Sequence, residues 1–417
     1  GYSIKFNQRS PKIKIPLHKW QKLLAANSGK SLTTDIWSFS DGKWNKYTQI
    51  KHHISTYPID PVLVYRLVHA TYLKWDKMGI YQRNITNFSE SAVIENNATG
   101  NGCMNCHSFS NNDPSKMLVH FRILHPGTII WNEGKLSKIN TATAKTLSAG
   151  IYPAWHPDGT HIAFSTGKIS PRLTTRQSKV VDVADRASDL MVYDLSENLV
   201  VPLPGDSVNR RENMPVWSPD GKMLYFICAP EVIKGDDESL LHIKYDLMRV
   251  AFNTDDNNWG KPEMVLSSGE TGLSISMPKI SPDGKYMICS MADFGYFTIF
   301  DRESDLYLIN LETREYRKLE INSSSAESHS SWSLNGRWLV FSSKRGDDVF
   351  SRPYITYFDS CGVAHNPFLL PQKDPEKYDQ ILANYNLPAL LKGKIELSPL
   401  EIRNMVYSEA ENAIVEK

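Results

Sequence analysis

Short runs of apolar residues alternate with polar turn residues along most of this chain. The runs at residues 223–226 and 338–341 are typical, and both are rich in aromatic and aliphatic side chains. Short runs of this kind, bounded by proline, glycine, serine and aspartate, predict β-strands joined by tight turns. The pattern therefore favours an all-β protein with many short strands.

Helical periodicity appears only toward the two ends. Apolar residues recur every three or four positions after a proline near the start of residues 60–79, and a glycine follows, which predicts a helix there. Ser398 and Glu401 have the spacing of a capping box, which predicts a last helix over residues 398–410. Residues 374–385 read as another helix. The two flanks are therefore expected to be small and partly helical.

One phrase recurs four times between these flanks. Its copies end at Gly159, Gly221, Gly284 and Gly336, at intervals of 62, 63 and 52 residues. Each copy is a strand followed by a turn, in which Asp or Asn supports the bend and glycine accepts a positive φ. A second hairpin then follows. Four short strands per repeat of this length are typical of the blades of a β-propeller.

These phrases resemble the repeats of TolB-like β-propellers, and the most specific piece is Trp-Ser-Pro-Asp-Gly-Lys at residues 217–222. The resemblance covers about residues 103–370 and implies six blades. Residues 106–147 then read as a degenerate first blade. Residues 35–50, with a hairpin turn at Asp41-Gly42, are the expected source of a sixth.

Three parts are expected on this basis. Residues 1–100 form an N-terminal segment of hairpin strands and one helix that contributes to a blade. Residues 101–370 form the TolB-like β-propeller, with the cysteine motif described next at its start. Residues 371–417 form a helical C-terminal extension. The fold class is therefore all-β, a six-bladed propeller with small helical flanks.

Cys103, Cys106 and His107 form C-x-x-C-H, the attachment sequence of a c-type haem. Two thiols at this spacing can each form a thioether to a haem vinyl group, and the adjacent imidazole is then the proximal ligand of the iron. With 5 Cys and 12 His in 417 residues, a shuffled chain would carry this motif roughly once in a thousand times. Haem c is therefore the expected cofactor.

Three other interpretations of the two cysteines are a redox pair, a zinc site and a disulfide. His120 and His125 follow at the spacing of a zinc finger, whose histidines lie on a helix. Residues 117–121 read as a strand, however, and Pro126 excludes a helix just after His125. A redox pair would need a helix start in a βαβ unit, which this region lacks. A disulfide stays open, and with it a non-enzymatic propeller that binds a protein or another ligand.

The motif, the preceding residues 78–83 and the blades together resemble a group of bacterial proteins described as cytochrome c-like TolB propellers. For that group the resemblance implies covalent haem and an extracytoplasmic location, periplasmic or facing the cell exterior. Protein made in a host cytoplasm would lack the haem. We expect electron transfer, with a redox protein or another protein docking on the propeller as partner.

The repeats also predict where the iron lies. The residues three places before the aromatic position of each phrase are Cys106, Tyr152, Met214, Met277 and His329. Equivalent residues of successive blades converge on the central channel, so the haem is expected at one mouth of that channel. Met214, Met277 and His329 are the candidate sixth ligands. A thioether ligand would raise the reduction potential, and a second imidazole would lower it.

Composition narrows the remaining functions. The net charge is +1, from 47 basic and 46 acidic residues, so no overall field favours nucleic acid. No apolar run approaches the roughly 18 residues of a membrane span. Attachment to a membrane would therefore depend on a lipid anchor upstream of residue 1. No G-x-S-x-G elbow is present, and the 47 residues after Leu370 cannot hold a hydrolase fold, so an electron carrier or a binding protein is favoured over an enzyme.

Overall fold

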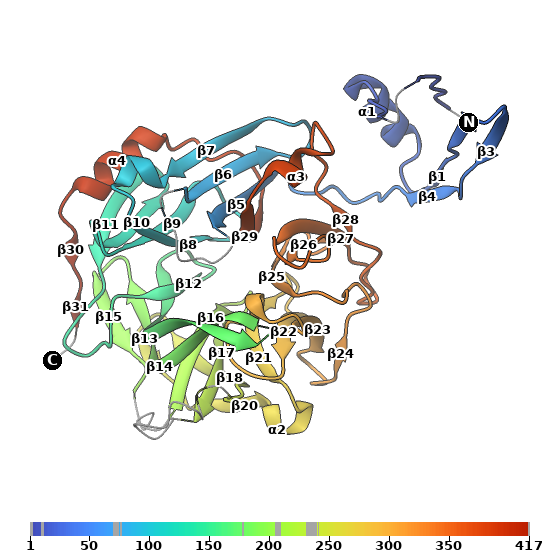
Figure 1. The fold of residues 1–417 in the computed structure, drawn as a ribbon. Helices are drawn as coiled ribbons and strands as arrows, with labels where there is room; N and C mark the ends of the chain where they lie inside the picture. Colours follow the sequence, from blue (N-terminus) through green and yellow to red (C-terminus); the bar gives the residue numbers. More distant parts are fainter. Residues whose placement is uncertain are drawn as a thin grey trace. The chain divides into compact units, whose positions relative to one another are not determined.

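The computed structural model describes residues 3–9, 12–69, 75, 77–176, 179–204, 210–230, 240 and 242–415. The chain divides into two compact units, residues 1–59 and residues 60–417. In the larger unit the strands form six sheets arranged in a ring, as Figure 1 shows. The larger unit is therefore a six-bladed β-propeller, as the repeats predicted.

Five blades follow one another along the chain. The first contains β8 (Cys103–Phe109), β9 (Lys116–Arg122), β10 (Gly127–Asn132) and β11 (Lys135–Asn140). The second contains β12 (Ile151–Trp155), β13 (His161–Arg176), β14 (Lys179–Asp194) and β15 (Leu199–Pro202). The third contains β16 (Arg210–Trp217), β17 (Met223–Pro230), β18 (Asp246–Asn253), β19 (Asn258–Trp259) and β20 (Glu263–Leu266). The fourth contains β21 (Ser274–Ile280), β22 (Tyr286–Ala292), β23 (Asp305–Asn310) and β24 (Tyr316–Lys318). The fifth contains β25 (Glu327–Trp332), β26 (Trp338–Ser343), β27 (Arg352–Tyr357) and β28 (Phe368–Leu369).

Both ends of the larger unit build the sixth blade. Its strand order is β29 (Ala383–Leu391), β5 (Val62–His69), β6 (Gly79–Asn84) and β7 (Glu90–Glu95). Contacts between neighbouring blades run from β8 to β12, β16, β21, β25 and β29. Each of these strands is therefore the innermost strand of its blade. Segments more than 300 residues apart in the sequence therefore pair side by side to close the propeller.

Two predicted helices are wrong in this blade. In place of a helix over residues 60–79, β5 and the start of β6 lie there, and residues 70–74 and 76 fall outside the described residues. β5 is buried on both faces, so its apolar run is nearly continuous and matches a helical period as well as a strand. Over residues 374–385 only the short helix α3 (Lys377–Gln380) forms, because β29 begins at Ala383.

Other short elements complete the larger unit. These are η1 (Asn96–Thr99), α2 (Ser268–Thr271), η4 (Thr298–Phe300), α4 (Pro399–Tyr407), β30 (Glu411–Asn412) and β31 (Ile414–Val415). The predicted capping box of α4 is confirmed: Ser398 Oγ accepts from the Glu401 N–H at 3.3 Å, and the Glu401 carboxylate accepts from the Ser398 N–H at 2.9 Å. β30 and β31 add to the outer edges of the first and second blades.

The repeated phrase owes its form to hydrogen bonds that recur from blade to blade. In the third blade, Asp220 Oδ1 accepts from the Lys222 N–H at 3.1 Å and from Ser218 Oγ at 2.5 Å, which fixes the turn. The Trp217 indole N–H donates to the Ala154 carbonyl of the blade before it at 3.1 Å. Trp332 repeats this bond with Lys279 at 3.2 Å. The phrase therefore encodes both a turn and a contact between neighbouring blades.

Residues 1–59 form a unit of their own. It contains α1 (Leu17–Ala26), β1 (Ser31–Thr34), β2 (Trp37–Ser40), β3 (Lys43–Lys46) and β4 (Ile50–His53), with β1 paired to β4 and β2 to β3. The turn predicted at Asp41-Gly42 is confirmed, with φ of 53° and 74°. The strands pair with one another, however, so the expectation that they supply a propeller blade is wrong.

Candidate functional site

A cavity of about 420 Å³ lies where the innermost strands meet. Its lining includes Cys103, Asn105 and His107 from β8, together with one residue at the same repeat position of each later blade. Those residues are Tyr152, Met214, Met277, His329 and Leu387. Ligand sites in proteins commonly measure about 300–1,000 Å³, so this cavity is large enough for a small organic ligand. The positions that the repeats aligned are therefore brought together at the hub.

The backbone at these positions departs from a regular strand in the same way in each of the five later blades. Each innermost strand carries a bulge. The residue at its start has a positive φ: 49° at Tyr152, 52° at Met214, 51° at Met277, 47° at His329 and 49° at Leu387. Positive φ is uncommon in residues other than glycine, and bulges redirect side chains. This common device places all five residues on the wall of the cavity.

The first blade has its bulge at the C-x-x-C-H motif. Its register shifts between Asn105 and His107, which puts Cys106 at the equivalent position. The side chain of Cys106 lies outside the described residues. Cys103 is a buried, free cysteine whose sulfur accepts a long hydrogen bond from Arg122 Nη2 at 3.7 Å. The motif thus lies on the innermost strand, at the edge of the cavity.

The His107 side chain is 7% exposed, and neither of its ring nitrogens makes a hydrogen bond of regular geometry. Burial lowers its pKa to about 3, and the nearby Arg66 guanidinium lowers it further, while a weak hydrogen bond with the Leu387 backbone opposes the shift. The imidazole is therefore neutral at physiological pH. A buried imidazole with an unused ring nitrogen is unusual, and it calls for an explanation such as a missing ligand.

His329 shares these properties on the fifth blade. It is 8% exposed, its Nε2 has no hydrogen-bond partner, and its ring lies 6.2 Å from that of Phe297. Burial lowers its pKa to about 3, with further lowering by Arg66, Lys279 and His107. The cavity therefore contains two neutral imidazoles that are close enough to influence one another, each with at least one unused nitrogen.

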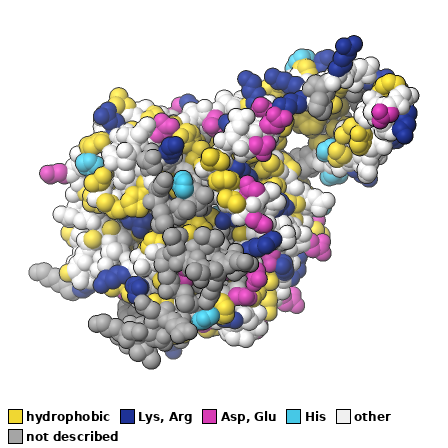
Figure 2. Space-filling view, viewed as in Figure 1, with side chains coloured by type: hydrophobic (Ala, Val, Ile, Leu, Met, Phe, Trp, Pro, Cys, Tyr) yellow, Lys and Arg dark blue, Asp and Glu magenta, His cyan; other side chains and the backbone are white. Residues whose placement is uncertain are grey.

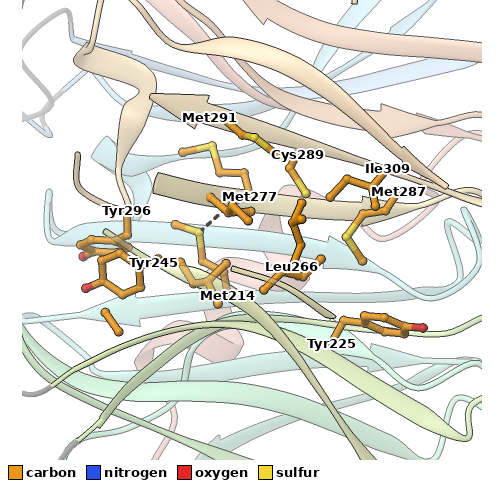
Figure 3. Packing of buried hydrophobic residues seen from close by; sticks show 14 of the residues in the cluster. Met214, Tyr225, Tyr245, Leu266, Met277, Met287, Cys289, Met291, Tyr296 and Ile309 are labelled. Carbon is orange, nitrogen blue, oxygen red and sulfur yellow. Dashed lines mark hydrogen bonds between the residues drawn. The ribbon is translucent and has the colours of Figure 1, made fainter. Parts of the chain in front are cut away.

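The two methionines are held differently. Met214 and Met277 belong to a buried cluster between the third and fourth blades, and Figure 3 shows them next to each other within it. The sulfur of Met214 accepts a hydrogen bond from the Met277 N–H at 3.3 Å. Both residues also line the cavity. Their side chains therefore pack in the core as well as facing the hub, and the Met214 sulfur already has a partner.

Cations line the cavity without any carboxylate among the described lining residues. Arg66, Arg122 and Lys279 are the charged members of the lining. Arg66 is buried and donates to the Met104 carbonyl at 3.2 Å, to Asn105 Oδ1 at 2.5 Å and to Asn386 Oδ1 at 2.9 Å. The Lys279 side chain is exposed to the space of the hub, and the protein that surrounds this space lowers its pKa by desolvation. The electrostatics of the cavity thus favour a ligand with negative groups.

Several lining residues are not among those predicted from the sequence. Arg66 and Met78 lie in or beside the stretch predicted as a helix, and Leu387 lies in the unrecognised sixth repeat. The pair Leu387-Pro388 does repeat Met214-Pro215 and Met277-Pro278, so the signal was present. Lys279 occupies the place of Ala154 and Val216 in the phrase. A charge at an apolar repeat position could have identified it.

The two histidines that follow the motif at zinc-finger spacing lie in different surroundings in the described part of the chain. His120 lies on β9, as predicted, and its Nδ1 is 2.9 Å from Thr128 Oγ1. His125 packs against Tyr407 with ring centroids 4.3 Å apart. Among the described residues, no group of three or more His, Cys, Asp or Glu could hold a metal ion. Cys228 and Cys289 are buried in strands, where they pack as small apolar residues.

Comparisons with known proteins address the fold. No protein-family model and no curated protein matches the chain. Among solved structures, TolB from Acinetobacter baumannii is similar over 90% of this chain and 85% of that chain, with 14% identity and a TM-score of 0.50. A hypothetical selenium-binding protein from Sulfolobus tokodaii is similar over 82% and 95% of the two chains, with 10% identity and a TM-score of 0.44. At such identities the likeness establishes a TolB-like propeller fold and nothing about the site. Within the described part of the chain, no helix is long and apolar enough to cross a membrane.

Proposed function

We propose that this protein is an extracytoplasmic c-type cytochrome that carries one haem in the hub cavity. The observation that carries the proposal is the pair of buried imidazoles, His107 and His329, whose unused nitrogens share one cavity. His107 belongs to the attachment sequence, so two unrelated features of the chain, a motif and a geometry, agree at one place.

The residues present fit such a group. Cys103 and Cys106 would form the two thioethers, and His107 would be the proximal ligand of the iron. His329 is the better sixth ligand, because its Nε2 is unpartnered whereas the Met214 sulfur accepts a bond from the Met277 N–H. When bound, haem would supply reversible one-electron transfer between the ferric and ferrous states.

Other residues of the cavity wall would bind the haem propionates and limit access of water. Arg66 and Lys279 would face the negatively charged propionate groups of the haem, since cations in a low-dielectric site attract carboxylates strongly. Ile169, Pro171, Val181 and Val183 of the long β13–β14 hairpin give the cavity an apolar wall, which would limit access of water. The hub would thus orient the group, and a redox protein that docks on the propeller would exchange electrons with it.

Expression together with a c-type maturation system tests the proposal. We expect a Soret band and haem that stays on the chain during denaturing electrophoresis. Substitution Cys103→Ser should leave at most one thioether, and His107→Ala should abolish normal ligation. Protein that matures correctly and is colourless would refute the proposal.

The sixth ligand is tested separately with three variants. We expect His329→Ala to change the visible spectrum and raise the reduction potential, while Met214→Leu and Met277→Leu keep the spectrum of the unmodified holoprotein. If the unmodified holoprotein instead shows the visible absorption of a methionine ligand and one leucine variant loses it, that methionine sulfur is the sixth ligand.

Titration of thiols in denatured, haem-free protein distinguishes the cytochrome from the alternative, a binding propeller in which Cys103 and Cys106 form a disulfide. A disulfide leaves three of the 5 cysteines reactive.

A further inference from the structure

Residues 1–59 differ from the rest of the chain in charge. They contain ten lysine and arginine residues and two aspartates, for a formal net charge of +8. Residues 60–417 contain 37 basic and 44 acidic residues, for a net charge of −7. The overall charge of +1 hides this division. A unit with so strong a positive charge is attracted to anionic surfaces.

The same unit exposes many apolar side chains. Of the 23 large hydrophobic residues that are exposed within the described part of the chain, ten lie in residues 1–59. Trp37, Phe39, Trp44 and Tyr47 are each more than half exposed. Figure 2 shows hydrophobic and basic side chains mixed on the visible face of this unit. Such a concentration of exposed apolar groups marks an interaction surface.

The β2–β3 hairpin gathers its aromatic rings on one face. Its register pairs Trp37 with Lys46 and Phe39 with Trp44, so these four side chains lie on the same side of the hairpin. The rings of Phe39 and Trp44 are 5.3 Å apart, and the Lys46 ammonium lies 5.2 Å from the Trp37 ring. All three rings remain more than half exposed. The hairpin therefore presents three aromatic rings beside a cation.

Helix α1 also combines basic residues with exposed apolar ones. Its ten residues include His18, Lys19 and Lys22 and no acidic residue, and Leu23 is its buried side chain. Leu17 and the nearby Ile13 are exposed. A basic amphipathic helix of this kind is typical of segments that lie on membrane surfaces.

We propose that residues 1–59 dock this protein on an anionic lipid bilayer. The rings of Trp37, Phe39 and Trp44 would enter the interfacial region, where aromatic side chains are favoured, while the lysines contact the headgroups. Nucleic acid also attracts cations and aromatic rings. The exposed Ile36 and Ile50, however, gain free energy only in an apolar medium, which favours a lipid surface.

Sedimentation of the full chain with lipid vesicles tests this surface. We expect binding to vesicles of equal parts phosphatidylglycerol and phosphatidylcholine, weakened by salt, and little binding to pure phosphatidylcholine. The exposed Lys43 and Lys51 are suited to substitution by Gln. Each should weaken binding about fivefold, since a basic residue near an anionic surface contributes about 1 kcal/mol. The matched propeller variants Lys135→Gln and Lys394→Gln should leave binding unchanged.

The aromatic face needs its own variant. The triple substitution W37S/F39S/W44S should weaken vesicle binding by at least about tenfold. The propeller variant F88S/F368S/L382S, which also removes three exposed apolar side chains, is its control. If the aromatic variant fails to fold, the lysine variants still decide the matter.

Several outcomes would overturn the proposal. These are no binding to anionic vesicles, equal losses in the test and control variants, tighter binding of a single-stranded oligonucleotide than of vesicles, and a dimer in solution that the aromatic variant abolishes. None of them bears on haem attachment, because the propeller's spectrum reports that function independently.

Discussion

His120 offers a quantitative test of how the first blade is packed. Its side chain is 1% exposed, and its Nδ1 lies 2.9 Å from Thr128 Oγ1. Burial lowers the pKa of the imidazole to about 3, with a smaller contribution from Arg122, compared with the usual value of 6.5 that applies in the unfolded chain. Lowering the pH from 8 to 4 tests this effect.

The sign of the effect follows from proton uptake. Between pH 6.5 and pH 3 the unfolded chain binds a proton at His120 that the folded chain does not bind, so the free energy of unfolding falls as the pH falls. With these two pKa values, His120 alone should cost about 2 kcal/mol at pH 5 and about 3 kcal/mol at pH 4. These losses are large compared with a typical stability of about 5–15 kcal/mol.

Urea unfolding of haem-free protein at several pH values is the assay. The variant His120→Asn keeps an acceptor for Thr128 but cannot be protonated, so its stability should fall by about 2 kcal/mol less than that of the unmodified protein between pH 8 and pH 5. The variant His52→Asn, at an exposed position of β4, is the control and should not alter the slope. If the pH dependence of His120→Asn equals that of the unmodified protein, the imidazole is not held neutral in the core and the reasoning fails.

Three further predictions concern stability and ligand binding. Ser398→Ala removes the cap of α4 and should lower the free energy of unfolding by about 1 kcal/mol, measured by urea unfolding, with the exposed Ser91→Ala as control. Met277→Ile should destabilise the protein more than Met277→Leu, because a β-branched residue is poorly suited to the φ of 51° at this bulge, and equal losses would contradict that view. Holoprotein should unfold at a higher temperature than haem-free protein, because the attached haem stays on the unfolded chain but would be buried and ligated by His329 only in the folded state, and unchanged melting would count against a haem in the hub.

The sequence was informative wherever structure depends on local interactions. The turns of the repeated phrase need a glycine at positive φ and a neighbouring Asp or Ser, so four blades could be recognised from short stretches such as that around Trp217. Convergence of Met214, Met277 and His329 followed from their common place in the phrase. The hub could thus be located before its shape was known.

The closing blade could not be predicted in the same way. β5 is apolar on both faces, so its local pattern fits two kinds of element, and only pairing with β29 decides between them. β29 lacks the Ser-Pro-Asp-Gly turn that marks other repeats. The favoured sixth ligand was equally out of reach, because the hydrogen bond from the Met277 N–H to the Met214 sulfur is a tertiary contact.

Ring closure through β29 has a consequence for biogenesis. Arg66 of the closing blade donates hydrogen bonds to Met104 and Asn105 within the C-x-x-C-H motif, and to Asn386 of the last inner strand. Until synthesis has passed Leu391, the nascent propeller is an open arc that lacks one wall of its central chamber. If haem is attached as proposed, the attaching enzyme would reach the Cys103 thiol, which is buried in the closed propeller, more easily before β29 pairs with β5.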